Sequence, residues 1–251
     1  MKRAYTREDE QSFVLPPGAV AATLDVLWPR HGVLDIQRQP FSLTKTRLRT
    51  ELHLYSERTT DMFRDRLTIW RKRKALFCNH DVKVYVRDDK FERREKSART
   101  TAKTLSLLHA FSPVRAAFLK ETCLLKFRSS DGQRRYTLQV GIAHLKALNI
   151  VDMSRVVGAQ FHVEFESKSP ETLARLIADE QLHTRLPALE PIAVSKWHWA
   201  AQLSDATTKF SFSSPASLLS FFDATVTMCS ADSVRLCDAF DVDPPAGQPY
   251  L

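Results

Sequence analysis

The sequence predicts an α+β fold, in which helices flank a closed or nearly closed antiparallel sheet. Short runs of alternating apolar and polar residues follow one another from residue 46 to residue 166, as successive antiparallel strands do. The dipeptide Asp131-Gly132 between two of these runs favours a hairpin turn. The pairs Ser169-Pro170 and Ser214-Pro215 have the composition of helix starts, a capping residue followed by proline.

Strands are expected over 46–55, 81–87, 90–96, 114–121, 123–128, 134–142 and 161–166. Between the first two, the spacing of Phe63, Leu67 and Trp70 predicts an amphipathic helix from residue 60 to residue 77. Near the end of the chain, Trp197 and Trp199 alternate around His198 and indicate a strand or a packing flap.

The organisation predicted along the chain has four parts. Residues 1–20 are polar and then proline-rich, which is typical of a flexible arm, and residues 244–251 form a tail. The sheet and its helices occupy residues 21–186, and residues 187–243 form an extension that packs on them.

Composition indicates an anionic partner. The net charge is +8 and the isoelectric point is near 9.4, so nucleic acid is the first candidate. The four cysteines have no CxxC spacing, which indicates neither a zinc site nor a disulfide framework. The start is too charged for a signal peptide and no apolar run approaches the ~20 residues that span a bilayer, so we expect a nuclear, or else cytoplasmic, protein without a membrane.

Basic residues recur at strand spacing in the middle of the chain. They are Arg93 or Arg94 with Lys96, then Arg115, Lys126 with Arg128, and Arg135. If these strands belong to one barrel, the cations converge on its interior, where burial without counter-charge is strongly unfavourable. A polyphosphate would supply the missing anion.

Two carboxylates share a strand face in the run "QFHVEFE". Glu164 and Glu166 lie two residues apart, and Glu51 on the first strand would be a third oxygen donor for a hard divalent cation that bridges phosphate oxygens. The plainer interpretation is a charged strand face, because cross-strand Glu–Arg pairs are ordinary.

The order of these features resembles the metal-dependent RNA 5′-triphosphatases of fungi, protozoa and large DNA viruses, which are triphosphate tunnel metalloenzymes. The resemblance covers roughly residues 46 to 180. It implies an eight-stranded antiparallel β-barrel around the triphosphate, with Mn²⁺ or Mg²⁺ on Glu51, Glu164 and Glu166. The implied reaction is release of the γ-phosphate from triphosphate-ended RNA, the first step of mRNA capping, by a monomer with an RNA guanylyltransferase as partner.

The resemblance also assigns roles to the basic residues. The implied phosphate ligands are Arg94, Lys96, Arg115, Lys126, Arg128 and Arg135, and the implied catalytic residues are Glu121, Arg115, Lys126 and Arg128, with Glu121 orienting the attacking water.

Three positions depart from the family pattern, since His53 stands where an acid is expected, and Thr137 and Gln139 replace an Asp and a Thr. Two other functions therefore stay open. One is a barrel without catalysis that acts in protein interaction, as certain transcription Mediator head subunits resemble this fold. The other is an RNA-binding module that uses the basic run from residue 64 to residue 74.

Overall fold

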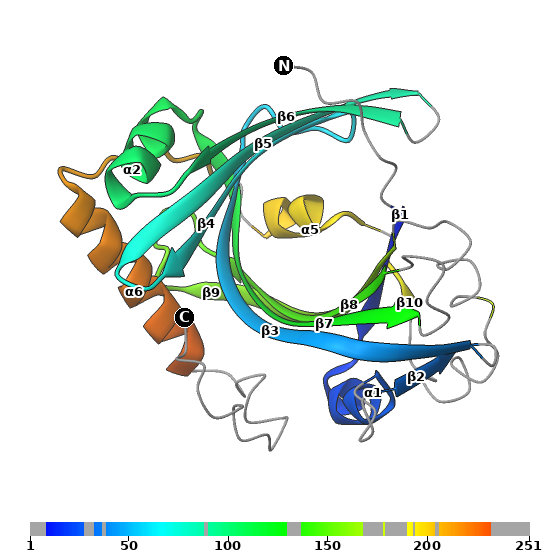
Figure 1. Cartoon of the computed structure of the whole chain (residues 1–251). Helices are drawn as coiled ribbons and strands as arrows, with labels where there is room; N and C mark the ends of the chain where they lie inside the picture. Colours follow the sequence, from blue (N-terminus) through cyan, green and yellow to red (C-terminus); the bar gives the residue numbers. More distant parts are fainter. Residues whose placement is uncertain are drawn as a thin grey trace.

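The computed structural model describes residues 9–27, 33–36, 39–87, 90–129, 137–167, 178, 190–192, 194–203 and 206–231. Its centre is one antiparallel sheet that curls around a short helix (Figure 1). The strands lie in the order β10-β1-β9-β8-β7-β3-β4-β5-β6, and β2 pairs with β3 beside this path. The elements are β1 (Asp9–Leu15), a 3-10 turn (Pro17–Ala19), α1 (Val20–Leu27), β2 (Val33–Ile36), β3 (Gln39–Ser56), β4 (Phe63–Lys72), β5 (Ala75–Arg87), β6 (Lys90–Ala98), α2 (Thr101–Ala110), β7 (Val114–Ser129), β8 (Thr137–Leu148), β9 (Val156–Ser167), β10 (Glu190–Pro191), α5 (Lys196–Gln202) and α6 (Pro215–Ala231).

Alternation along the strands separates a convex face, which bears two apolar clusters, from a concave face, which bears the charged residues around Glu51. In β3, Leu52 and Leu54 belong to a buried apolar cluster, whereas Glu51 between Thr50 and Leu52 points to the other side. Helix α5 lies inside the curl of the sheet, on the side of Glu51 (Figure 1). The concave face is therefore defined by α5 and by the strand residues that share its side.

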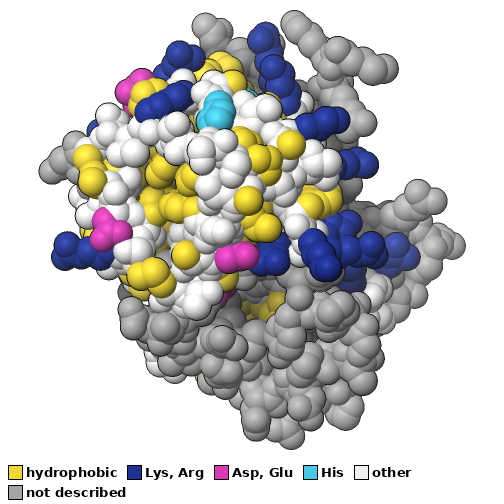
Figure 2. Space-filling model, turned by 90° about the vertical axis from the view of Figure 1, so that its left-hand side faces the viewer, with side chains coloured by type: hydrophobic (Ala, Val, Ile, Leu, Met, Phe, Trp, Pro, Cys, Tyr) yellow, Lys and Arg dark blue, Asp and Glu magenta, His cyan; other side chains and the backbone are white. Residues whose placement is uncertain are grey.

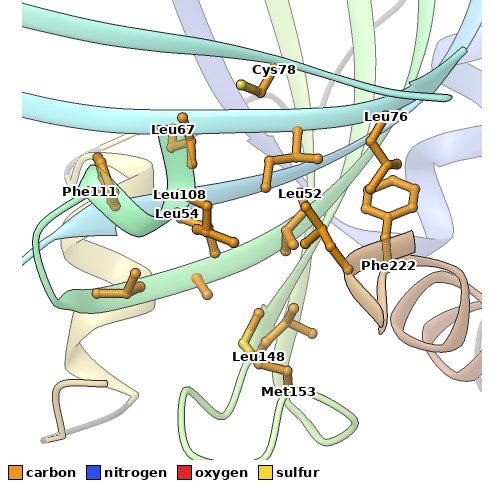
Figure 3. Close-up of a cluster of buried hydrophobic side chains, with 14 of the residues drawn as sticks. Leu52, Leu54, Leu67, Leu76, Cys78, Leu108, Phe111, Leu148, Met153 and Phe222 are labelled. Atoms are coloured by element: carbon orange, nitrogen blue, oxygen red, sulfur yellow. The ribbon is translucent and has the colours of Figure 1, made fainter. Parts of the chain in front are cut away.

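Two apolar clusters cover the convex face. In the cluster of Figure 3, Leu52 of β3 and Leu76 of β5 pack against Leu108 of α2 and Phe222 of α6. A second cluster lies under β1 and α1 and includes Phe13, Leu15, Val20, Cys123, Leu125, Phe127, Val140 and Phe165. Burial of these side chains is the main stabilising contribution to the sheet.

The two longer helices on the convex side have clear starts. Thr100 caps α2 by accepting a hydrogen bond from the Lys103 amide, and α6 begins at Pro215 after Ser214, as predicted. The surface over these helices is apolar in its middle, and Lys and Arg gather along one edge (Figure 2). No helix among the described residues is long and apolar enough to cross a membrane.

The helix expected from residue 60 to residue 77 is wrong, because this segment forms the hairpin β4–β5. Lys72 pairs with Ala75, so only Arg73 and Lys74 form the turn, and Arg73 takes the left-handed conformation with φ 57°. Neither residue is a usual turn former, which hid the hairpin. The β-branched Thr68 and Ile69 favour a strand. The apolar spacing of this segment allows either a helix or a strand, and pairing of β4 with β3 selects the strand.

Two further elements differ from expectation. The runs 114–121 and 123–128 are one continuous strand, β7, because Cys123 and Thr122 keep the alternation without a break. The segment around Trp197 and Trp199 is helix α5, in which Ala200 and Ala201 are buried, not a strand or flap.

The predicted antiparallel sheet is confirmed, and it holds eight strands when the short β2 and β10 are set aside. Part of the expected arm, Asp9–Leu15, pairs with β9 as strand β1. No pairing between β6 and β10 or β1 exists among the described residues, so closure into a barrel stays a prediction. The predicted turn at 131–132, Arg135 and the helix start at 169–170 lie outside the described residues.

Candidate functional site

A basic pocket of about 390 Å³ lies on the concave face, within the size range of ligand sites. Its lining residues come from β3 (Lys45, Arg47, Arg49, Glu51), β7 (Lys120, Thr122, Leu124, Lys126), β8 (Gln139, Gly141) and β9 (Glu164, Glu166). Five cations therefore stand against three carboxylates. The pocket is suited to an anionic ligand.

The strand register explains why these side chains converge. Directly opposite positions in β3 and β7 are Lys45 with Lys126, Arg49 with Thr122 and Glu51 with Lys120. Like charges directly opposite one another destabilise a sheet. The Lys45–Lys126 pair therefore concentrates positive charge at this part of the pocket.

Glu164 is held by two lysines. Its carboxylate accepts hydrogen bonds from Lys120 Nζ at 2.7 and 2.9 Å and forms an ion pair with Lys196 Nζ of α5 at 2.7 Å. Burial opposes ionisation of Glu164, but the charges and hydrogen bonds of the two lysines outweigh it and lower its pKa well below the ordinary value. Glu164 is therefore a carboxylate near neutral pH.

Glu51 has its own cationic neighbours. Arg49 Nη2 lies 2.6 Å from Glu51 Oε1, and His53 Nε2 lies 3.4 Å from Glu51 Oε2. Burial would raise the pKa of Glu51, but the His53 hydrogen bond and the charges around it lower it to about 2. Burial also lowers the pKa of His53 to about 4, against the pull of Glu51. His53 is thus neutral near pH 7, where Arg49 and Lys120 supply the counter-charge of Glu51.

Helix α5 fills one end of the concave face. Ala200 and Ala201 pack with Tyr55 and Phe118 in a buried cluster. A Cβ on Gly158 would lie 2.7 Å from Leu203 Cδ1, so the helix end approaches β9 closely at this glycine. The other end of the pocket is bordered by exposed Lys45 and Arg47, so a ligand would enter from there.

Two donors in the pocket lack partners. Arg49 Nε and Thr122 Oγ1 are buried and have no hydrogen-bond partner in the part of the chain that the structure describes. Buried polar atoms without partners cost free energy, and a polar ligand would satisfy both.

The structure brings four of the sequence-predicted residues together in this pocket: Glu51, Glu164, Glu166 and Lys126. Arg128 lies two residues beyond Lys126 on β7 and is exposed, outside the lining. Glu51, Glu164 and Glu166 therefore all lie on the concave face.

Four other predicted residues do not reach the pocket. Arg94 and Lys96 are exposed on β6 and lie opposite Val82 and His80, whose positions belong to the convex face. Arg115 is the extra residue of a bulge at the start of β7 and is exposed. Glu121 lies on the convex face, where Lys146 Nζ donates to it at 2.9 Å. Alternation turns Arg94, Lys96 and Glu121 away from the pocket, and the bulge sets Arg115 apart from its lining.

Sequence reasoning missed several lining residues. Lys120 and Thr122 would have been found by reading β7 as one strand, since they share a face with Lys126. Arg49 carried a signal too, because it lies two residues before Glu51. Lys196 does not line the pocket but contacts Glu164, and it carried no signal, because this contact depends on where α5 docks.

The carboxylates do not form a metal centre as they stand. Within the described ranges, no group of three or more His, Cys, Asp or Glu side chains lies close enough to hold a metal ion. Glu51 and Glu164 are already engaged with cations. The arrangement fits an anion better than a divalent cation.

Comparison with known proteins gives distant likenesses only. No family model matches the chain, and no curated protein matches it. Among solved structures, it is similar to a putative adenylyl cyclase from Hippeastrum with a dominant triphosphatase activity (13% identity, 80% of this chain, 98% of that chain, TM-score 0.46). It is also similar to a protein from Pyrococcus horikoshii OT3 (9% identity, 74% and 96% covered, TM-score 0.41) and to an RNA triphosphatase from S. pombe (12% identity, 70% and 71% covered, TM-score 0.30). All these TM-scores lie below 0.5, so no property of these proteins is transferred to this chain on their strength.

Proposed function

We propose that the concave pocket binds a polyphosphate group and that the protein releases the γ-phosphate of triphosphate-ended RNA. The observation that carries this proposal is the excess of cations in the pocket, with Lys45 directly opposite Lys126 and only three carboxylates among the lining residues. A chain of phosphates would neutralise this excess and accept hydrogen bonds from Arg49 Nε and Thr122 Oγ1.

The same cations would assist hydrolysis. Charge grows on the phosphate oxygens as the γ-phosphate leaves, and preorganised lysine and arginine side chains stabilise it. In the proposed reaction, Lys126 and Arg49 bind the phosphates and Lys120 neutralises charge deeper in the pocket. The family resemblance implies Mn²⁺ or Mg²⁺ on Glu51, Glu164 and Glu166, but cations already engage Glu51 and Glu164, so the proposed reaction relies on the lysine and arginine side chains.

One observation favours a second candidate, a binding protein without catalysis. Lys120 and Lys196 together occupy the carboxylate of Glu164, and His53 stands where an acid would complete a metal site. Such a pocket would hold a polyphosphate end without cleaving it.

Phosphate release and binding should be measured side by side. The wild-type protein is expected to show a thermal shift with tripolyphosphate through binding linkage, and to release phosphate from triphosphate-ended RNA in Mn²⁺ or Mg²⁺. Lys126→Ala should weaken tripolyphosphate binding roughly 10- to 100-fold, as expected for loss of a charge-assisted hydrogen bond. Lys96→Ala, which removes an exposed lysine from the convex face, is the matched control and should bind as the wild type does.

Each result has a distinct meaning. Binding without release in either metal would favour the second candidate. Absence of any thermal shift with tripolyphosphate, or equal losses in both lysine variants, would refute both functions.

A further inference from the structure

An aromatic platform lies beside the pocket on the concave face. Trp70 of β4 is directly opposite Glu51 of β3, and Phe77 of β5 is directly opposite Trp70, so all three share one face. The rings of Trp70 and Phe77 have centroids 6.2 Å apart with an interplanar angle of 33°. Both residues are half-buried, so neither is sealed from solvent.

Cations adjoin both rings. The guanidinium of Arg49, a pocket residue, lies 4.5 Å from the centre of the Trp70 ring, and Lys72 Nζ lies 5.6 Å from that of Phe77. Arg49 therefore belongs to the pocket and to the platform at once. Beyond Lys72, exposed Arg73 and Lys74 form the turn of the hairpin.

A tryptophan on a solvent-accessible strand face needs an explanation. A strand face that binds only inorganic phosphate needs charged and small polar residues, and charged residues do line the neighbouring part of β3. It does not need a tryptophan. Aromatic rings and arginine planes together are the groups on which nucleobases stack, and they tolerate every base.

We propose that the platform of Trp70, Phe77 and Arg49 stacks the nucleobase of a nucleoside triphosphate whose phosphates lie in the pocket. The inference rests on the proposed function, and it names the substrate class as a nucleotide, free or at the 5′ end of RNA. The base stacks on the platform while the phosphates meet Arg49 and the lysines beyond it.

Three probes test this inference on the full chain. Inorganic tripolyphosphate, ATP and a short triphosphate-ended oligoribonucleotide are titrated by calorimetry without added divalent metal. Trp70→Ala should weaken ATP and RNA binding about 5- to 150-fold, because a base stacked on an aromatic ring is worth about 1–3 kcal/mol. Its affinity for tripolyphosphate should change less than about twofold, since no phosphate ligand is removed.

Trp70→Phe is the conservative variant, because it keeps a flat ring and should retain most of the ATP affinity. It also covers the case in which Trp70→Ala fails to fold, since ATP should quench tryptophan fluorescence in the wild type and do so less in Trp70→Phe. Tighter binding of RNA than of ATP would indicate further RNA contacts with the basic hairpin. Equal affinities would indicate that only one nucleoside is stacked, and either result supports the platform.

Three results would overturn the proposal. The first is that the wild type binds tripolyphosphate as tightly as it binds ATP and RNA. The second is that Trp70→Ala weakens the binding of all three probes equally. The third is that ATP quenches the tryptophan fluorescence of Trp70→Phe as much as that of the wild type. The second of these would mean that Trp70 only braces Arg49. A wild type that binds none of the probes would instead refute the proposed function itself.

Discussion

Replacing His144 by leucine should reduce the loss of stability in mild acid. His144 lies on the convex face of β8, is 5% exposed and stacks on Phe161 with centroids 4.1 Å apart. Burial, and after it the charge of Lys146, lowers the pKa of His144 from 6.5 to about 4. The other charged group facing it is Glu121, whose Oε2 lies 3.8 Å from His144 Nδ1.

The magnitude follows from proton linkage. Since the folded-state pKa of His144 is depressed, the unfolded chain takes up the proton first, and the neutral ring contributes stability that is complete above pH 6.5 and is lost as the pH falls toward 4. With 1.36 kcal/mol per pKa unit, the wild-type protein at pH 5 has lost about 2 kcal/mol through this residue.

Urea unfolding of the wild type and of His144→Leu between pH 8 and pH 5 measures this contribution. The free energy of unfolding should fall by about 2 kcal/mol less in the variant than in the wild type over this range. The difference between the two proteins should be constant above pH 7.5, which is the internal control. Equal slopes would mean that His144 is solvated and would contradict its burial against Phe161.

Further predictions concern the pocket and its floor. Gly141→Ala should bind tripolyphosphate normally in calorimetry, because the new Cβ lies 3.5 Å or more from its neighbours. Gly141→Leu fills the pocket without removing a charge and should abolish binding. Equal binding by the two variants would contradict the pocket. Glu164→Gln removes the carboxylate that the half-buried Lys120 and Lys196 share and should lower the free energy of unfolding by about 1.5–3 kcal/mol. Tripolyphosphate should then raise the melting temperature more than in the wild type, and a smaller rise would count against anion binding. Phe118→Ala, at 1% exposure, should cost about 3–5 kcal/mol in urea unfolding, and Met62→Ala, at 59% exposure, within about 0.5 kcal/mol; similar costs would place Phe118 outside the core.

The strand faces of the two acid-bearing strands could be predicted because the signal is local. Glu51 and the pair Glu164 and Glu166 lie on the faces that alternation assigns to them, and all three line one pocket. The same reasoning placed Arg94 and Lys96 on one strand face, but it could not tell which face turns inward. That choice depends on the register with β5, which alternation within β6 does not contain.

The hairpin β4–β5 shows a second limit. Its apolar residues fit a helical period as well as a strand period, and its turn at Arg73 and Lys74 lacks glycine and asparagine. Only pairing with β3 makes it a strand and carries Trp70 to the edge of the pocket. The most informative aromatic residue was therefore assigned to the wrong element.

By itself, the sequence determined the antiparallel alternation, the basic excess and the shared face of the carboxylates, because each depends on covalent order and a period of two. Only the tertiary structure decided that Lys120 and Lys196 neutralise Glu164 and that α5 fills one end of the concave face. The two ion pairs join residues 44 and 32 positions apart, and the cluster around α5 joins Ala200 to Tyr55 across a still longer stretch of chain. Sheet register and helix docking create these contacts, so their energies exist only once the chain has folded.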